Sequence, residues 1–550
     1  MWQSFLLSLA LRVLMACHGH SGEGNPPMYG DFEAQRHWME ITLHLPVRDW
    51  YKNTTDNDLQ YWGLDYPPLT AYGSYLWGYI FDQIEPDMVA LHTSRGYETV
   101  LSKVLMRLSV IVSDLLVYYP AVFLFVSVVD LTDEKVKVGE SQRSFSTKSV
   151  VTHALLFFPS LIFIDHGHFQ YNGVSLGLFI AAVAFFFAKR ETGGAVDMMC
   201  DFLAAVCFSL ALNYKQMCLY YALPVFCLCL RKVFDMPSMV TKVLRFFTFA
   251  AAVLLTFGVV WAPFLVETKK ELGAGVKMTE TTVGWVLHRV FPVARGLFED
   301  KVSNFWCAFN PVLKTRERLS LPMQMRVCLF LTLAGCIPGC WSVLTRPARD
   351  RRTFVLAAVG SAFSFFLFSF QVHEKSILLP LTPFLLLAGE LPFLTLFFSS
   401  ASLLSMAPLI VRDGQGIVYA IVLLSSIFAL FTLVVRPRYY LLRFLSPSSV
   451  ENRLATNDAY HAVAILLIAT LSCSAISYHL LEMWMEPLPT LPDLFLVMLV
   501  FACGSVFLLL YVASTSLLLL PSSPFGGGQK TMSRAGAAQQ EKDEKSKKND

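Results

Sequence analysis

Residues 244–266 read LRFFTFAAAVLLTFGVVWAPFLV, an apolar run that contains a single charged residue, Arg245. A transmembrane α-helix needs about 20 predominantly apolar residues, so this run is long enough to cross a bilayer. Similar runs occur at 4–17, 105–131, 149–165, 173–189, 198–213, 217–231, 323–343, 353–370, 376–394, 396–411, 417–435, 460–482 and 491–520. Together they predict an all-α polytopic membrane protein with about 14 transmembrane helices.

The composition of the whole chain favours the same class of protein. Of the 550 residues, 55% are hydrophobic and only 15% are charged, and the mean hydropathy is +0.52. Soluble domains contain about 25% charged residues. The net charge of +3 gives no indication of a nucleic acid partner, and we expect none. The 12 cysteines lie mostly inside apolar runs, where a thiol behaves as a small hydrophobic group, so no disulfide framework is indicated.

The first apolar run is short and carries a charge at Arg12. We interpret residues 1–17 as the first transmembrane helix. The alternative is a cleaved signal peptide, for which LMAC at 14–17 offers a small-residue site. No basic segment precedes the run, which is unfavourable for that alternative.

Basic residues in short loops predict the orientation, because cytosolic loops carry an excess of Lys and Arg. They collect at 132–148, 190–197, 232–243, 344–352 and 436–459. The segment 18–103 therefore faces the lumen, as does the second long loop at 267–322. The first of these segments carries a glycosylation sequon at Asn53.

The rest of the organisation follows from this orientation. Residues 104–266 hold transmembrane helices 2–7, and residues 323–520 hold helices 8–14. Residues 521–550 are polar and Lys-rich, so we expect a disordered cytosolic tail. Its lysines at 547 and 548 resemble a dilysine signal for retrieval to the endoplasmic reticulum, which suggests a multi-pass protein of that membrane.

Five polar clusters lie at helix ends on the predicted luminal side. Ionisable groups at a membrane are costly, so such clusters are candidates for function. They cover 28–72, 165–172, 213–217, 288–306 and 371–376, and include His168 and Lys215. A transporter would more often place its charges at the bilayer midplane, where this chain is apolar. The shared side favours a single luminal active site.

The stretch GDFEAQRHWME begins a predicted amphipathic helix over 31–45, which we expect to lie on the membrane surface. Its first residue, Asp31, has two interpretations. It can be a functional carboxylate, with Gly30 allowing close approach of a ligand, or it can cap the N-terminus of the helix.

The stretch YWGLDYPPLTAY at 61–72 is stiffened by its two prolines. The aromatic residues around Asp65, among them Trp62 and Tyr66, suit either a sugar-stacking surface or an interfacial aromatic belt. Composition alone does not choose between them.

Two short motifs resemble metal sites. Asp56-Asn57-Asp58 has the D-x-D form of metal-dependent glycosyltransferases but lacks a preceding apolar strand. The run from Asp165 to His168 has zinc-ligand residue types without a recognised spacing, so hydrogen bonding at a helix end is the favoured role. We expect no metal site.

Several motifs resemble, in order along the chain, those of the endoplasmic reticulum α-1,3-glucosyltransferases that use dolichyl-phosphate-glucose. They are PPMYGDFEAQRHWMEIT, YWGLDYPPLTAY, GHFQYNGVSLG, LALNYKQM, FPVARGLFEDKVSNFWC and QVHEKSILLPL. The resemblance covers about residues 11–520 and implies a GT-C fold, in which luminal loops carry short interfacial helices. The chain departs from the family in its short N-terminal segment and in His166, which has no firm place in the pattern.

The resemblance implies an inverting transfer of glucose from dolichyl-phosphate-glucose to a dolichyl-diphosphate oligosaccharide, the precursor of protein N-glycosylation, without a metal or other cofactor. It implies that Asp31 is the catalytic base, that Asp65 is a second important acid and that His373 lies near the donor phosphate. Fixed cations would stabilise the leaving phosphate, although contact with lipid headgroups is the alternative role for each. The candidates are Arg289, Arg295, Lys301, His373 and Lys375; Trp62, Tyr66, His168 and Lys215 complete the predicted substrate contacts. The alternative functions are the sibling enzyme that adds the second glucose and, from a different class, a multi-pass transporter.

Overall fold

The computed structural model describes residues 2–131, 147–190, 194–265, 267–272, 276–291, 302–435, 458–484 and 493–519. The helices of the first half are α1 (Trp2–Ala16), α2 (Gly30–His44), α3 (Pro68–Asp82), α4 (Val100–Ser113), α5 (Tyr119–Val128), α6 (Thr147–Leu156), α7 (Pro159–Leu161), α8 (Asn172–Phe187), α9 (Ala195–Tyr214), α10 (Ala222–Phe234) and α11 (Met239–Trp261). Those of the second half are α12 (Thr282–Val290), α13 (Phe305–Leu313), α14 (Thr315–Arg318), α15 (Leu321–Thr345), α16 (Arg351–Phe368), α17 (Leu378–Leu385), α18 (Pro392–Ser405), α19 (Ala407–Arg412), α20 (Gly416–Val435), α23 (Asp458–Trp484) and α24 (Leu494–Leu519). Short 3₁₀ and π segments complete them: η1 (Val47–Asp49), η2 (Pro86–Met88), η3 (Asp114–Tyr118), η4 (Ile162–Phe169), η5 (Gln216–Tyr221), η6 (Ala262–Phe264) and η7 (Glu374–Ile377).

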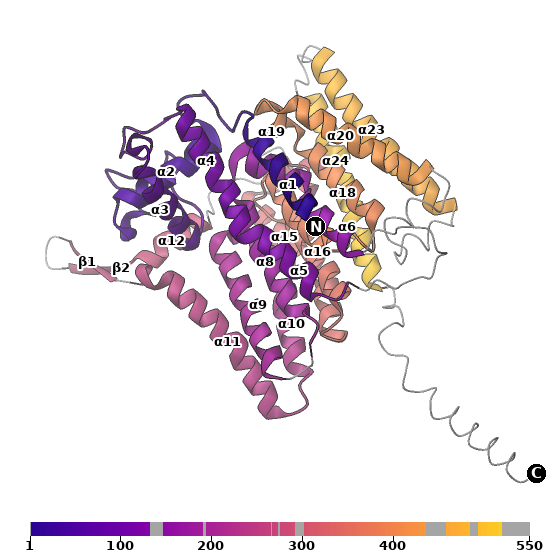
Figure 1. Ribbon diagram of the computed structural model, residues 1–550, viewed down its shortest axis with the longest axis horizontal. Coiled ribbons are helices and arrows are strands. Elements are labelled where there is room, and N and C mark those ends of the chain that lie inside the picture. The colour runs from indigo at the N-terminus through magenta and orange to yellow at the C-terminus, as the bar shows by residue number, and fades with distance from the viewer. Residues whose placement is uncertain are drawn as a thin grey trace, which may run out of the picture.

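Long apolar helices make up the body of the molecule (Figure 1). Within the described residues, ten continuous helical segments are long and apolar enough to cross a membrane, and α1, α8 and α18 are shorter apolar helices. The protein is therefore a helical, multi-span membrane protein, as the sequence predicts. The expected number of about 14 spans is not established by this criterion.

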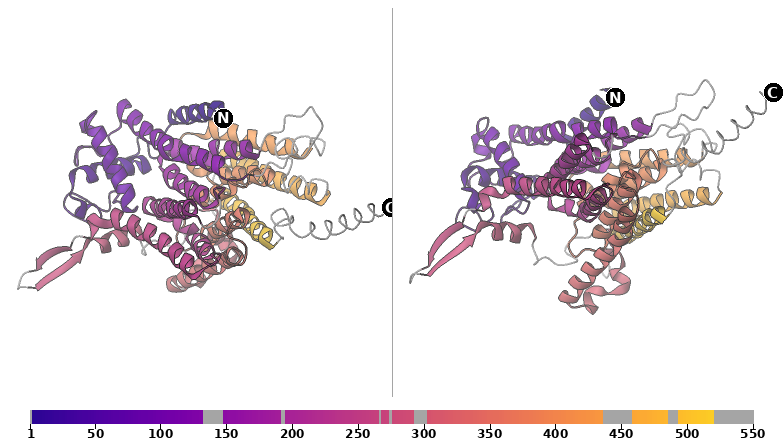
Figure 2. Two further views of the ribbon diagram at one scale, coloured as in Figure 1. Left: turned by 60° about the horizontal axis from the view of Figure 1, so that its bottom comes forward. Right: turned by 90° about the horizontal axis from the view of Figure 1, so that it is seen from below.

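One hairpin departs from the all-helical pattern. Strands β1 (Glu267–Leu272) and β2 (Val276–Thr281) pair antiparallel, with Glu267 opposite Thr281. Figure 2 shows the hairpin projecting away from the helices. It lies in the second long loop of the sequence, so the bundle itself remains helical.

Arg12 explains how α1 tolerates a charge. Its side chain is fully buried and its Nε donates to Asp114 Oδ2 at 2.9 Å. Its Nη1 also donates to the carbonyl of Leu156 at 2.9 Å. An ionised side chain inside a membrane bundle needs such partners, and these contacts account for a charge in an otherwise apolar helix.

A cap of short helices and loops lies at one end of the bundle (Figure 1). It is formed by α2, α3, α12 and the loops that flank α2 and α3. Gly78 of α3 permits close packing within this cap, because an added Cβ there would lie 2.8 Å from the carbonyl oxygen of Met39 in α2. The helix α3 begins at Pro68, a position where a missing N–H costs nothing.

The helix α2 corrects one expectation. The amphipathic pattern predicted a helix lying on the membrane, but the side chains from Phe32 to Thr42 are all buried. The polar residues are enclosed because they pair with one another, as described below. The helix is consequently a central element of the cap, held on all sides.

Candidate functional site

A cavity of about 1580 Å³ opens where the cap meets the bundle. Its lining comes from segments far apart in the chain, with contributions from residues 19–38, 59–66, 168–176, 215–220, 289–291, 369–379 and 409–414. These include parts of all five polar clusters that the sequence singled out. The last segment, 409–414, is one that sequence reasoning missed.

Asp31 lies in the wall of this cavity, and its carboxylate is the meeting point of three elements. Its Oδ2 accepts hydrogen bonds from Lys375 Nζ at 2.5 Å and Gln170 Nε2 at 2.5 Å, and lies 3.1 Å from His168 Nε2. All three partners address the same oxygen. Among the described residues, no donor reaches Oδ1, so that oxygen is the one left for a ligand.

The entry into α2 fixes this position. Tyr29 has a φ of 53° and Gly30 a φ of 68°. An added Cβ on Gly30 would lie 2.5 Å from the carbonyl of Ser21, so glycine is required there. The Ser21 Oγ accepts a hydrogen bond from the backbone N–H of Asp31 at 3.1 Å. The Asp31 side chain does not cap the helix, which answers the alternative interpretation left open by the sequence.

The charge of Asp31 is set by opposing effects. Burial would raise the pKa of the Asp31 carboxyl, but the Lys375 ammonium and the hydrogen bond from His168 hold this pKa well below its usual value. The side chain is still 22% exposed, toward the cavity. The site thus presents an ionised, accessible carboxylate.

The amide of Gln170 is oriented by its other neighbours. Its Oε1 accepts from Lys215 Nζ at 3.2 Å and from the Tyr66 hydroxyl at 3.4 Å, which turns its NH₂ group toward Asp31. Lys215 also donates to Asn172 Oδ1 at 2.5 Å and lies 4.7 Å from the centre of the Tyr66 ring. Burial lowers the pKa of the Lys215 ammonium to about 8. Lys215 therefore has partners within the protein and supports Gln170.

The loop of Trp62 and Asp65 forms another part of the wall. Trp62 has a φ of 50°, and its indole Nε1 donates to the Met28 carbonyl at 2.5 Å. Arg289 donates to the carbonyls of Gly63 at 2.7 Å and Leu64 at 3.3 Å. These contacts make Arg289 a support of this loop. Asp65 lines the same cavity as Asp31.

The remaining predicted cations are His373, Lys375, Arg295 and Lys301. His373 and Lys375 both line the cavity, and His373 is exposed there. Arg295 and Lys301 lie outside the described residues.

The motifs that resemble metal sites are engaged in hydrogen bonds. Asp56 Oδ1 lies 3.1 Å from His92 Nε2, and Asn57 donates to the carbonyl of Asp49 at 3.0 Å. Asp165 accepts from Asn172 at 2.7 Å. In the parts of the chain that the structure describes, no group of three His, Cys, Asp or Glu side chains is arranged to hold a metal ion.

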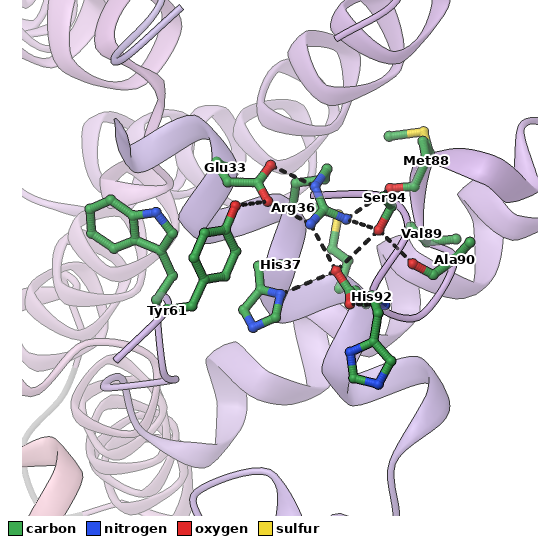
Figure 3. A network of polar contacts seen from close by, with 12 residues as sticks. Glu33, Arg36, His37, Tyr61, Met88, Val89, Ala90, His92 and Ser94 are labelled. Carbon is green, nitrogen blue, oxygen red and sulfur yellow. Dashed lines mark hydrogen bonds and ion pairs between the residues drawn. The ribbon is translucent and has the colours of Figure 1, made fainter. Parts of the chain in front are cut away.

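A buried polar network holds α2 in the cap (Figure 3). Arg36 donates to both oxygens of Glu33, at 2.6 and 2.7 Å, and to Glu40 at 2.8 Å. It also donates to the Met88 carbonyl at 3.0 Å and to Ser94 Oγ at 2.5 Å. The network ties the helix that carries Asp31 to the neighbouring loop, and so fixes the carboxylate relative to the cavity.

Further hydrogen bonds extend the network from Glu33 and from Glu40. The Tyr61 hydroxyl donates to Glu33 at 2.8 Å, and Glu40 accepts from the backbone N–H of His92 at 2.8 Å (Figure 3). Burial would raise the pKa of the Glu40 carboxyl, but hydrogen bonding to His37 and the Arg36 charge lower it to about 2. The Glu40 carboxylate is thus ionised and paired.

The sequon residue is not part of the cavity lining. Asn53 is exposed, and its side-chain oxygen accepts from the backbone N–H of Leu59 at 3.1 Å.

The fold and site together define a class: a multi-span membrane protein with a cavity, lined by charged side chains, where its bundle meets a cap of short helices. The model of the ALG6, ALG8 glycosyltransferase family matches residues 8–514, and the chain belongs to that family.

Curated relatives agree with this assignment. The chain is 40% identical to the dolichyl pyrophosphate Man9GlcNAc2 alpha-1,3-glucosyltransferase of Rattus norvegicus, over 92% of this chain and 94% of that protein. It is 43% identical to the protein of the same name from Gallus gallus, over 77% of each. It is 38% identical to that from Saccharomyces cerevisiae, over 92% of this chain and 89% of that protein. Among solved structures, ArnT from Cupriavidus metallidurans bound to undecaprenyl phosphate matches with a TM-score of 0.37 and 13% identity, over 94% of this chain and 76% of that one.

Proposed function

We propose that this protein transfers glucose from dolichyl-phosphate-glucose to the terminal mannose of dolichyl pyrophosphate Man9GlcNAc2, forming an α-1,3 linkage with inversion. The acceptor and the linkage follow the names of the relatives. The donor and the GT-C type of fold follow from the resemblance of the motifs. At the site, the proposal rests on the convergence of Lys375, His168 and Gln170 on one oxygen of Asp31.

The reaction is a single displacement. The 3-hydroxyl oxygen of the acceptor mannose bonds to C1 of glucose while the bond from C1 to the phosphate oxygen breaks, and dolichyl phosphate leaves with the electron pair. The hydroxyl proton passes to a carboxylate, which we assign to Asp31 Oδ1. A carboxylate whose pKa is held low by Lys375 and His168 is ionised at luminal pH and ready to accept it.

The leaving phosphate needs positive charge, which fixed cations supply best in a site with little water. His373 is exposed in the cavity and Lys375 lines it close to Asp31, so we assign the phosphate to these two side chains. Arg295 and Lys301 remain candidates. Arg289 and Lys215 act through the protein contacts that they make.

The wall formed by Trp62, Asp65 and Tyr66 suits the acceptor sugar. Aromatic faces and a carboxylate are the groups with which proteins hold sugar rings, and the loop is fixed by Arg289 and by Trp38, whose indole donates to the Trp62 carbonyl at 2.8 Å. In this assignment Asp65 binds the acceptor and does not take the proton.

The same proposal includes the membrane arrangement. The segments 18–103 and 267–322 lie in the lumen of the endoplasmic reticulum, the transmembrane segments are 1–17, 104–266 and 323–520, and the tail 521–550 is cytosolic. The asymmetry of basic residues between the loops supports this orientation.

The test is a transfer reaction. Membranes containing this protein, incubated with radiolabelled dolichyl-phosphate-glucose and dolichyl pyrophosphate Man9GlcNAc2, should yield a labelled oligosaccharide whose glucose is α-1,3-linked. An acceptor that already carries one glucose should receive no label. Labelling of only the second acceptor would instead identify the sibling activity, and no labelling of either would contradict the proposal.

A further inference from the structure

His168 lies between two carboxylates. Its Nε2 is 3.1 Å from Asp31 Oδ2, and its Nδ1 is 2.5 Å from Asp413 Oδ2. The carbonyl of His168 accepts from the backbone N–H of Ser21 at 3.0 Å, and Ser21 is the same residue that holds the N–H of Asp31. The imidazole is 2% exposed and Asp413 is 1% exposed at their side chains, so both groups are buried.

Asp413 reaches His168 because the joint between α19 and α20 packs tightly against η4. Gly414 has a φ of 76° and makes the turn. Gln415 donates to the carbonyl of Gly19 at 3.0 Å, and an added Cβ on Gly167 would lie 2.3 Å from Gln415 Oε1. Three segments distant in sequence thus meet beside this imidazole, and Gly167 has no space for a methyl group.

The contact with Asp413 fixes the orientation of the His168 ring. A carboxylate accepts only, so Nδ1 donates to Asp413 and Nε2 donates to Asp31, and both ring nitrogens of His168 carry a proton, as in an imidazolium. The ring is thereby oriented with Nε2 toward Asp31 Oδ2, and Lys375 Nζ lies 3.2 Å from the same Nε2. Lys375, Gln170 and His168 together occupy Oδ2.

We propose that Asp413 is a positioning residue of the glucosyl transfer, which acts through His168 to hold the Asp31 carboxylate with Oδ1 directed to the acceptor hydroxyl. This inference rests on the proposed function. It assigns a role in the reaction to a residue of the 409–414 segment, whose only signal in the sequence is a polar interruption, RDGQ, between two apolar runs.

The test compares Asp413→Asn with wild type in the purified full-length protein, with kcat and KM measured for both substrates. The amide keeps the shape of the carboxylate but loses its charge. The expected result is a fall in kcat of about 10- to 100-fold, a part of the roughly 10²- to 10⁴-fold that a positioned acid–base group contributes. KM for either substrate and the thermal midpoint should change little.

A double-mutant cycle separates this role from simple packing. If Asp413 acts through His168, then Asp413→Asn should have no further effect on kcat in a His168→Ala background. Asp235→Asn is the matched control. The Asp235 carboxylate pairs with Arg231 at a distance of 2.7 Å and does not line the cavity, so this substitution should leave kcat unchanged.

The outcomes are distinguishable. Equal kcat in wild type and Asp413→Asn, or additive losses in the double variant, would overturn this inference while leaving the proposed function intact. A wild-type protein that transfers no glucose would overturn the proposed function and this inference with it.

Discussion

Replacing Arg36 by methionine should release α2 from the cap. Arg36 is fully buried and its guanidinium contacts Glu33 and Glu40, which are themselves buried. Methionine keeps much of the side-chain volume but leaves two buried carboxylates without their cation. We expect the segments joined by this network, 30–44 and 88–94, to open more often than in the wild type.

The magnitude can be worked out in two ways. Removing one partner of a buried ion pair costs about 3–5 kcal/mol. For comparison, the lowering of the Glu40 pKa from 4.5 to about 2, which the hydrogen bond with His37 and the Arg36 charge produce together, corresponds to about 3 kcal/mol at 1.36 kcal/mol per pKa unit. Because about 1.4 kcal/mol is a tenfold change, opening should become roughly 10²- to 10³-fold more frequent.

Hydrogen–deuterium exchange of the purified protein measures this opening directly. The amides of 30–44 should exchange faster in Arg36→Met, whereas the bundle helix α16 should be unaffected. Arg48→Ala is a matched control, because Arg48 has a side chain 61% exposed and its loss should change little. Adding Glu40→Gln to Arg36→Met should recover part of the protection.

The same network predicts a pH dependence. Since the folded-state pKa of Glu40 is depressed, its contribution to stability is fully present above its ordinary pKa of 4.5 and is lost as the pH falls toward about 2. Protection of α2 should therefore decline over that range in the wild type. Unchanged exchange in Arg36→Met at neutral pH would refute the reasoning.

Three further predictions concern the site and the orientation. Burial raises the pKa of Asp31 and Lys375 lowers it, so Lys375→Met should move the acidic limb of the kcat–pH profile to higher pH; an unmoved limb would separate Lys375 from the base. Asn53 should be glycosylated, so endoglycosidase should shift the mobility of wild type but not of Asn53→Gln, and protease access to this loop in sealed microsomes would contradict the topology. Activity should survive EDTA, whereas loss with rescue by manganese would point to Asp56 and Asp58.

The periodic and compositional features of the chain predicted the membrane class well. Apolar runs long enough to span a bilayer are independent of tertiary detail, so the helices around 244–266 and 323–343 appear where expected, as α11 and α15. The polar clusters could also be recognised, because ionisable residues at helix ends stand out from an apolar background.

The sequence could not show which polar side chains pair with each other. The amphipathic pattern over 31–45 suggested a helix on the membrane surface, yet the mutual contacts of Glu33, Arg36 and Glu40 allow all three to be buried. Lys215 and Arg289 carry the right charge for a phosphate, but their hydrogen-bond partners lie 43 to 226 residues away and are known only from the fold.

Asp413 shows the same limit. It follows an apolar run as one charge in a short loop, and it becomes significant only through its contact with His168, 245 residues away in the sequence. A polar turn between two transmembrane helices is common, so no local pattern marks this one.

The most direct test of the account is the kinetic comparison of Asp31→Asn with Asp65→Asn in the transfer reaction. Asparagine is nearly isosteric with aspartate but cannot take up the hydroxyl proton. Asp31→Asn should lose about 10²- to 10⁴-fold in kcat and keep donor binding, whereas Asp65→Asn should raise KM for the acceptor and retain measurable turnover at high acceptor concentration. Equal kcat in the two variants, or undiminished turnover by Asp31→Asn, would contradict the assignment of Asp31 as the base.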